Sequence, residues 1–247
     1  MTLLLFFSAA SDVADSRLSD AVDVNNIDAF AQKFLDFSNP DAVYFVVAMK
    51  RFKDGNTDVK NRYVEYSDKW FINSQAKWDA SVPQFVKVSQ DNNARIYAYP
   101  NARSASQIAF YGGQMKANGV RNPYSRAAGR SYDLPERPIT HLDVDSTDPK
   151  VLQRVRDVLK REGLVPVLEY TSTSGDKHFI FGDKSVFKID WSAEGVGTVK
   201  DIRTGKYDPY SVVAPELGKP MLLYYEGSGS TANYSQYNAK RQKRGIS

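Results

Sequence analysis

Two aspartates placed two positions apart, Asp143 and Asp145, are the side chains of this sequence best suited to chemistry. They lie in the segment 140–145, where Leu142 and Val144 are typical of a buried strand. Because side chains alternate along a strand, both carboxylates fall on one face and repel each other. A bridging divalent cation relieves this repulsion, as in enzymes that hold Mg²⁺ or Mn²⁺ for phosphate chemistry. The spacing therefore indicates a metal site, and a solvated strand end or capping pair is the alternative.

A second polar segment follows about thirty residues later, with Ser174, Gly175 and His178 in the order Ser-Gly-x-x-His. A Ser-Gly turn offers a hydroxyl and backbone N–H groups to phosphate oxygens, and glycine permits a close approach. The histidine can donate a hydrogen bond to the same charge. An ordinary hairpin turn with a half-buried histidine is the alternative.

The elements that must position these residues can be read from the surrounding pattern. Asp148 and Pro149 are a favoured N-cap and first helical residue, and Gly163 is a favoured helix end. Strands are expected at 164–170 and 178–181. The order strand, helix, strand, strand favours a helix packed on a mostly antiparallel sheet, in the manner of an RNA-recognition (RRM-like) module.

An N-terminal α/β module is expected over residues 1–125, followed by the RRM-like module over 126–226 and a disordered basic tail over 227–247. Apolar spacing predicts an amphipathic helix within 26–37, and Ser104 is a candidate N-cap for a helix that reaches Met115. Strands are predicted at Val43–Met49, Arg62–Tyr66 and Arg95–Pro100, a turn at 53–56, and partial helix within 70–82.

The combination of Asp-x-Asp, an intervening helix, Ser-Gly-x-x-His and a later acid resembles the catalytic pattern of the archaeo-eukaryotic primase (AEP) superfamily. That family includes stand-alone primases and primase-polymerases of phages and plasmids. The resemblance covers about residues 95–225 and implies an α+β catalytic core. It further implies metal binding by Asp143 and Asp145, with Asp190 as third acid and Asp201 in reserve. Contacts to the nucleotide are implied for Ser174, Gly175, His178 and Arg103.

The resemblance implies a DNA primase or primase-polymerase, a metal-dependent nucleotidyltransferase that uses Mg²⁺ or Mn²⁺ and nucleoside triphosphates on a single-stranded DNA template in DNA replication. Larger family members carry a helicase region that this sequence lacks, so a separate replicative helicase is an expected partner. Two alternatives stay open. One is a catalytically inactive, AEP-like protein that binds single-stranded nucleic acid, and the other is a metal-dependent nuclease or phosphoesterase.

Composition limits the other possibilities. The 247 residues contain no cysteine and two histidines, which excludes disulfides and thiolate metal sites and argues against zinc. The net charge of +4 permits a polyanionic partner without requiring one. Residues 1–10 are apolar but lack the basic start of a secretion signal, so a buried first element or a frayed start is expected there. A soluble protein of the cytoplasm, or of the host cytoplasm if viral, with no membrane partner is the resulting expectation.

The segment 118–138 is rich in Asn, Pro, Gly and Arg and is expected to be a loop. Its arginines suit a solvated connector. They equally suit a nucleic-acid contact, because arginine pairs with phosphates and tyrosine stacks on bases. The relevant side chains are Arg121, Tyr124, Arg126, Arg130, Tyr132 and Arg137.

Overall fold

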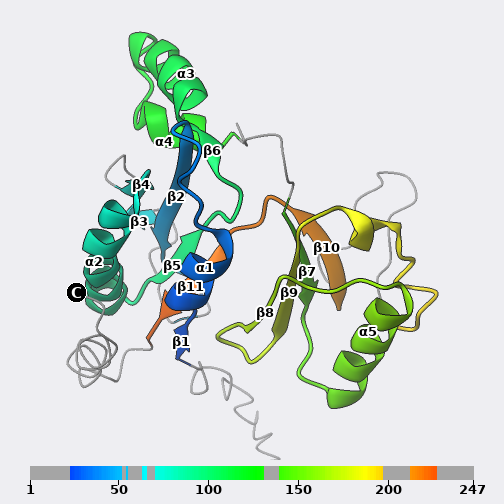
Figure 1. The fold of residues 1–247 in the computed structure, drawn as a ribbon. Coiled ribbons are helices and arrows are strands. Elements are labelled where there is room, and N and C mark those ends of the chain that lie inside the picture. The colour runs from blue at the N-terminus through cyan, green and yellow to red at the C-terminus, as the bar shows by residue number, and fades with distance from the viewer. Residues whose placement is uncertain are drawn as a thin grey trace, which may run out of the picture.

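The computed structural model describes residues 23–51, 54, 63–65, 70–130, 139–196 and 212–226, and these form two antiparallel sheets with five α-helices (Figure 1). The α+β class expected from the sequence is confirmed. Four sets of predictions fall wholly or largely outside the described residues: the first ten residues, the 53–56 turn apart from Asp54, the reserve acid Asp201, and the basic tail together with Tyr132 and Arg137.

The first sheet is built around one long buried strand, β2 (Ala42–Met49), whose eight residues are all buried. Its main order is β1-β11-β5-β2-β3, and β4 and β6 also pair with β2. The other strands are β1 (Val24–Asn25), β3 (Tyr63–Glu65), β4 (Phe71–Ile72), β5 (Arg95–Ala98), β6 (Arg103–Ser104) and β11 (Met221–Tyr225).

Each face of this sheet has its own helical cover. Helices α1 (Ile27–Phe34) and α2 (Gln75–Asn92) contribute Phe30 and Phe85 to a core on the face that carries Val46. The opposite face carries Val43, Phe45 and Val47, and it packs against α3 (Ala105–Ala117) and α4 (Pro123–Ala128). The α3–α4 hairpin projects beyond the end of β2 (Figure 1).

The second sheet has the order β10-β7-β9-β8. Its sequence order is β7 (Thr140–Val144), α5 (Pro149–Arg161), β8 (Leu168–Thr171), β9 (Lys177–Phe181), the 3₁₀ helix η3 (Ser185–Lys188) and β10 (Val213–Leu217). Asp148 caps α5, since its side chain accepts a hydrogen bond from the backbone N–H of Lys150. Helix α5 packs through Val155 and Val158 on the sheet face that carries Leu142.

Three features join the two sheets. The chain leaves β10 and, after a short turn, enters β11 of the first sheet. At the start of β7, the side chain of Asn101 accepts a hydrogen bond of 2.8 Å from the backbone N–H of Ile139. Tyr170 and Ile180 of the second sheet belong to the same apolar core as the first sheet. The face of the second sheet opposite α5 is therefore turned towards the first sheet.

Chain segments cross between the modules at both of their edges. Residues 126–128, placed by the sequence in the second module, belong to α4 and pack beside α3 of the first. Likewise β11 pairs with β1 and β5 of the first sheet although it follows β10 in the chain. The segment 118–138, expected to be a loop, contains the short helix α4, and Pro123 is the first residue of that helix.

Within the residues that the structure describes, none of the helices has the length and apolar character needed to cross a bilayer.

Candidate functional site

The alternation of side chains along β7 separates an apolar face from a polar one. Leu142 and Val144 point into the core beneath α5. His141 and Asp143 therefore occupy the opposite face, which is turned towards the first sheet. Burying a charged residue here requires a partner for its carboxylate, and the neighbouring strands supply several.

Asp143 faces His178 directly across the β7–β9 ladder, where the two residues are register partners. The His178 Nδ1 atom lies 3.0 Å from Asp143 Oδ1, at hydrogen-bonding distance but without hydrogen-bonding alignment. On its other side, the His178 ring stacks on Tyr170, with ring centroids 4.7 Å apart and an interplanar angle of 8°. The two sequence motifs thus meet at one point, and Tyr170 fixes the orientation of the histidine.

Lys219 supplies the cation of this site. It lies in the turn between β10 and β11, and its ammonium group donates a hydrogen bond to Asp143 Oδ2. The same Nζ atom lies 3.1 Å from the carboxylate of Glu216. Burial lowers the pKa of Lys219, but the charges of Asp143 and Glu216 outweigh it and leave the pKa raised. Lys219 is therefore charged and bridges two carboxylates.

His141 is the most unusual group behind this site. The residue is fully buried, and neither ring nitrogen has a hydrogen-bond partner among the described residues. Burial, together with the nearby His178 and Lys219, lowers the pKa of His141 well below its ordinary value. The imidazole is consequently neutral, and its ring meets Tyr170 edge-on with a centroid distance of 6.3 Å.

Asp145 lies just beyond the end of β7 and is exposed, whereas Asp143 is half-buried. The backbone N–H of Asp145 donates to the carbonyl of Val212, which extends the pairing with the segment before β10. The two aspartates therefore differ in environment. Asp143 is held by partners within the fold, and Asp145 presents a carboxylate at the surface.

The turn that carries Ser174 and Gly175 packs against the loop that follows Asp145. Gly175 adopts a left-handed φ of +84°, and a Cβ there would lie 3.3 Å from Thr147 Cγ2. Ser174 Oγ donates to Asp176 at 2.6 Å, and the N–H groups of residues 174 and 175 both donate to Ser172. These N–H groups satisfy the turn itself, so a phosphate bound there would have to replace those bonds.

Asp190 is placed elsewhere. Its carboxylate accepts hydrogen bonds from the backbone N–H groups of Ser192 and Ala193 and so stabilises the turn after η3. The charge of Asp190 acts on Glu194, which binds Arg161 of α5. Asp190 therefore lies with the α5 layer, on the other side of the sheet from Asp143. The structure brings Asp143 and His178 together but does not bring Asp190 to them.

Arg103 and Arg95 are both buried in the first sheet. The Arg103 guanidinium lies over the Tyr99 ring, 4.8 Å from its centroid, on the sheet face that α3 and α4 cover. Arg95 instead binds the carboxylate of Asp54 with two hydrogen bonds and lies over the ring of Tyr225. Arg95 is therefore committed to this internal pair.

Comparison of the chain with protein-family models, curated proteins and solved structures found no match to any of them. The assignment of the site therefore rests on its residues and their geometry.

A divalent cation would find the carboxylates of Asp143 and Glu216 here, both bound to Lys219, and that of Asp145 just beyond the end of β7. No group of three acidic, histidine or cysteine side chains able to hold a metal occurs among the described residues. Mg²⁺, however, is commonly held by one or two carboxylates together with substrate phosphates and water. The residues thus fit a cation that arrives with a triphosphate, provided that Lys219 releases Asp143.

Sequence reasoning missed Lys219, Glu216 and Tyr170 as members of the site. Glu216 pairs with His141 in the β10–β7 register, and Tyr170 pairs with His178 in the β8–β9 register. The alternation of side chains along a strand places Glu169 and Tyr170 on opposite faces. Nothing in the sequence around them indicated which of the two shares a face with Asp143. Lys219 gave no signal, because the turn that carries it is joined to Asp143 only through sheet pairing.

Proposed function

We propose that this protein is a metal-dependent nucleotidyltransferase of the AEP type, a primase or primase-polymerase that extends primers on single-stranded DNA at the Asp143 face of the second sheet. The observation that carries the proposal is the pairing of Asp143 with His178 on adjacent strands, 3.0 Å apart and facing the first sheet. Residues from the two motifs that resemble the family are thereby joined in one site.

The topology of the second sheet supports the same proposal. Its order β10-β7-β9-β8, with α5 between β7 and β8, follows the β-α-β-β pattern and strand order of an RRM-like, ferredoxin-like module. In this arrangement the strands at the centre of the sheet are β7 and β9. The acid and the histidine therefore occupy the two best-supported strands, where neighbours on both sides fix their positions.

Each side chain has a separate task in this proposal. Asp143 and Asp145 hold Mg²⁺ or Mn²⁺, which when bound supplies Lewis-acid activation of the 3′-hydroxyl and neutralises the leaving pyrophosphate. His178 donates to a phosphate oxygen, with its ring fixed by Tyr170. Lys219 exchanges its ion pair with Asp143 for one with the incoming triphosphate, a stronger anion. Ser174 offers its hydroxyl beside the same loop.

A template-directed extension assay with Mg²⁺ or Mn²⁺ tests the function. The wild-type chain should incorporate nucleotides on a primed single strand, and Asp145→Asn should reduce incorporation while the fold is kept. Asp190→Asn and Asp201→Asn, assayed in parallel, show which acid completes the site; the placement of Asp190 beside α5 predicts that its loss has the smaller effect. Incorporation that persists in both Asp143→Asn and Asp145→Asn would refute the proposal, and metal-dependent degradation of the strand would favour a nuclease.

A binding protein without catalysis is the second candidate, and one observation favours it. Lys219 already provides the cation that Asp143 and Glu216 need, so the fold is electrostatically complete without a metal. In such a protein Lys219 would remain paired with Asp143. Two results together would support this second function. The wild-type chain would incorporate no nucleotide, and Asp143→Asn would bind single-stranded DNA as tightly as wild type.

A further inference from the structure

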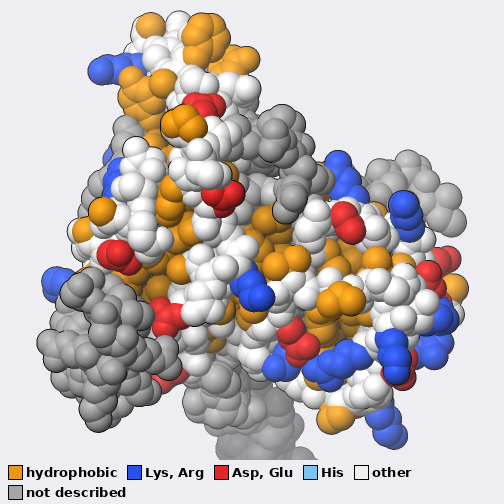
Figure 2. Space-filling model, viewed as in Figure 1, with side chains coloured by type: hydrophobic (Ala, Val, Ile, Leu, Met, Phe, Trp, Pro, Cys, Tyr) orange, Lys and Arg blue, Asp and Glu red, His pale blue; other side chains and the backbone are white. Residues whose placement is uncertain are grey.

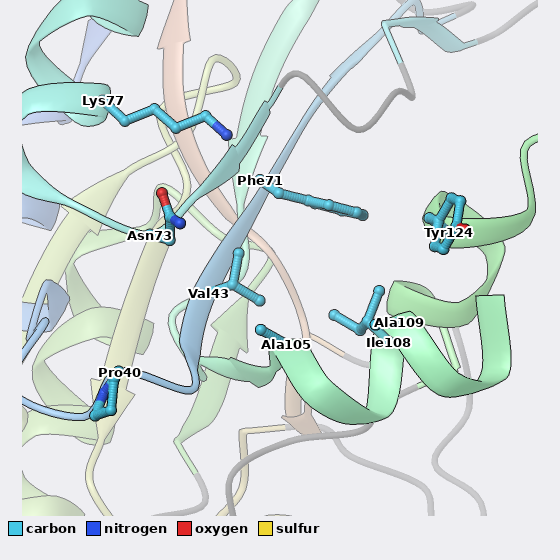
Figure 3. Close-up of a pocket in the computed structure, with 9 residues that line it drawn as sticks. All are labelled: Pro40, Val43, Phe71, Asn73, Lys77, Ala105, Ile108, Ala109 and Tyr124. Atoms are coloured by element: carbon cyan, nitrogen blue, oxygen red, sulfur yellow. The ribbon is translucent and has the colours of Figure 1, made fainter. Parts of the chain in front are cut away.

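A pocket of about 330 Å³ lies in the first module, apart from the Asp143 site (Figure 3). Strands β2 and β4 and helices α2, α3 and α4 all contribute to its wall. Its volume is at the lower end of the range of about 300 to 1,000 Å³ typical of small-molecule sites. The main lining side chains are Val43, Phe71, Asn73, Lys77, Ile108 and Tyr124.

Two half-buried aromatic rings face this pocket from different elements. Phe71 extends from β4 towards Tyr124 of α4, and the aliphatic side chains of Val43 and Ile108 lie below them (Figure 3). Phe71 is anchored from behind by Phe45, with ring centroids 4.9 Å apart. Lys77 and Asn73 bring a charge and an amide to one side. The pocket thus combines a flat apolar interior with polar groups at its edge.

The position of Tyr124 depends on a glycine within α3. A Cβ built at Gly112 would lie 2.2 Å from Tyr124 Cδ1, so any larger residue there must displace the ring. Glycine inside a helix is unfavourable relative to alanine. The neighbouring Gly113 has open space around it. The close contact at Gly112 shows that the packing of α3 against α4 fixes the position of the Tyr124 ring.

The charges on the hairpin beside the pocket are of one sign. Residues 105–130, which contain the α3–α4 hairpin, carry four basic residues and no Asp or Glu. Lys116, Arg121, Arg126 and Arg130 are all exposed. The carboxylate nearest in sequence to the pocket wall, Asp41, is engaged by the hydroxyl groups of Ser104 and Ser106 and by the Ser106 N–H. The hairpin therefore complements a polyanion.

Two exposed aromatic side chains, Phe110 and Tyr111, lie elsewhere on α3. Phe110 is 61% exposed, and its ring lies against that of Tyr111, 5.1 Å away. Figure 2 shows the hairpin as a projection with apolar side chains over much of its surface and one basic group at its left. Aromatic platforms combined with a basic track are the features by which proteins bind single-stranded nucleic acid. A duplex would not serve, because its stacked and paired bases cannot enter a pocket.

From these features we infer that the α3–α4 hairpin binds a single strand of nucleic acid, with one unpaired base held between Phe71 and Tyr124. Lys77 and the arginines of the hairpin contact the phosphates, and the Asn73 amide faces the edge of the base. The further assignment of this strand as the template rests on the proposed function. Strand binding is nevertheless measured without any catalysis.

The test is fluorescence anisotropy of a labelled oligo(dT) strand with the full chain. Tyr124→Ala and Phe71→Leu should each weaken binding about 5- to 100-fold, the effect of removing one base–aromatic stack. Tyr124→Phe keeps the ring and should bind within about twofold of wild type, since stacking uses the π-face. A strand made of abasic sugar-phosphate should lose the dependence on Tyr124. Circular dichroism verifies that each variant is folded.

Gly112→Ala and Gly113→Ala form a matched pair that leaves the aromatic residues themselves unchanged. Both add a methyl group to α3, but only the first collides with Tyr124. Gly112→Ala should therefore weaken oligo(dT) binding, and Gly113→Ala should leave it unchanged. For the phosphate track, Arg126→Ala should reduce the slope of log K against log salt by about 0.7, with Lys150→Ala on α5 as the neutral control.

Several outcomes would overturn the inference. One is a wild-type chain that does not bind oligo(dT), and another is binding that is unaffected by Tyr124→Ala, Phe71→Leu and Gly112→Ala in folded variants. Binding of an apolar peptide in the pocket, in place of the strand, would overturn it as well. Failure of the proposed function is distinguishable, because a chain without extension activity whose strand binding still depends on Tyr124 retains this site.

Discussion

Among the described residues, two ion pairs of low exposure, Arg95–Asp54 and Lys219–Asp143, are built differently. In the first sheet, Arg95 and Asp54 are joined by two hydrogen bonds, with side-chain exposures of 5% and 1%. In the second, Lys219 and Asp143 have exposures of 24% and 13%, and each has a further charged or titratable neighbour. The first pair is closed to solvent, and the second is reachable and shared.

The difference concerns what each pair can exchange. A guanidinium that binds a carboxylate through two parallel bonds has a fixed geometry, and no ligand can compete without breaking both. An ammonium is a point charge on a flexible stem, and it transfers readily to another anion. The Arg95 pair therefore stabilises the fold, whereas in the proposed function the Lys219 pair would hold Asp143 until a ligand replaces it.

Asp143→Asn is the substitution with the largest expected effect on function. Loss of the carboxylate removes the proposed cation ligand and the anionic neighbour of His178, and Lys219 keeps only Glu216. Primer extension should fall by about 1,000-fold or more, because metal-assisted charge stabilisation is worth several kcal/mol and each 1.4 kcal/mol is a factor of ten. Single-turnover incorporation measures the loss. Unimpaired extension by a folded Asp143→Asn chain would show that this pair is as inert as the first.

Asp54→Ala tests the closed pair, and its expected effect is on stability. It leaves the Arg95 guanidinium buried without its carboxylate, which costs about 3 to 5 kcal/mol. For a chain of this size, the melting temperature should fall by about 10 °C. Asp91→Ala is the control, because the Lys87–Asp91 pair has side-chain exposures of 68% and 54% and contributes little. Equal melting temperatures for the two variants would contradict the contrast.

Lys219→Ala sharpens the comparison from the other side. Without the ammonium, Asp143 and Glu216 repel each other, and stability should fall by about 2 kcal/mol. Mn²⁺ should then restore part of this loss, since a ligand that binds only the folded state raises the melting temperature. Lys219→Arg retains the charge and should respond less to the metal. If Mn²⁺ leaves the melting curve of Lys219→Ala unchanged, Asp143 is not a metal ligand and the binding function is favoured.

Local pattern was sufficient to predict the elements that carry the site. The cap at Asp148 and the apolar stripe that includes Val155 indicated α5 within a residue or two of its observed start. The alternation around Leu142 indicated β7. The Asp143 and His178 motifs were identified because each places polar groups in a strand that is otherwise apolar. Caps, apolar stripes and strand alternation all depend on residues that are close in sequence, so the sequence pattern alone indicates them.

Pairing between distant segments could not be predicted in the same way. Lys219 reaches Asp143 only because β10 lies beside β7, and no local pattern encodes that adjacency. The return of β11 to the first sheet is equally non-local. Asp190 had the expected apolar residues before it, but they form a 3₁₀ turn under α5 in place of a strand. Short polar turns and strand ends share the same residue types, so tertiary packing decides between them.

His141→Phe is expected to have the smallest effect on stability. The sign of the change tells whether His141 destabilises the fold or makes a favourable interaction. The imidazole is fully buried with both nitrogens unpartnered among the described residues. An unsatisfied buried polar group costs about 1 to 3 kcal/mol, so an apolar ring of similar shape should stabilise the fold by about 1 kcal/mol after repacking. Urea denaturation at neutral pH measures the change. Marked destabilisation would mean that His141 has a partner that the described residues do not supply.

The pH dependence of the same variant gives an independent reading. In the folded chain the pKa of His141 is well below its ordinary value of about 6.5, whereas in the unfolded chain it is ordinary. Below pH 6.5 the unfolded state therefore binds a proton that the folded state does not, and this histidine costs up to about 1.4 kcal/mol of stability per pH unit as the pH falls. His141→Phe should lose that acid sensitivity, while Lys219, raised in pKa by Asp143 and Glu216, stays charged throughout. Parallel acid-unfolding curves for wild type and variant would show that His141 is not held neutral. The difference between the Arg95–Asp54 pair and the Lys219–Asp143 pair would then rest on Lys219 alone.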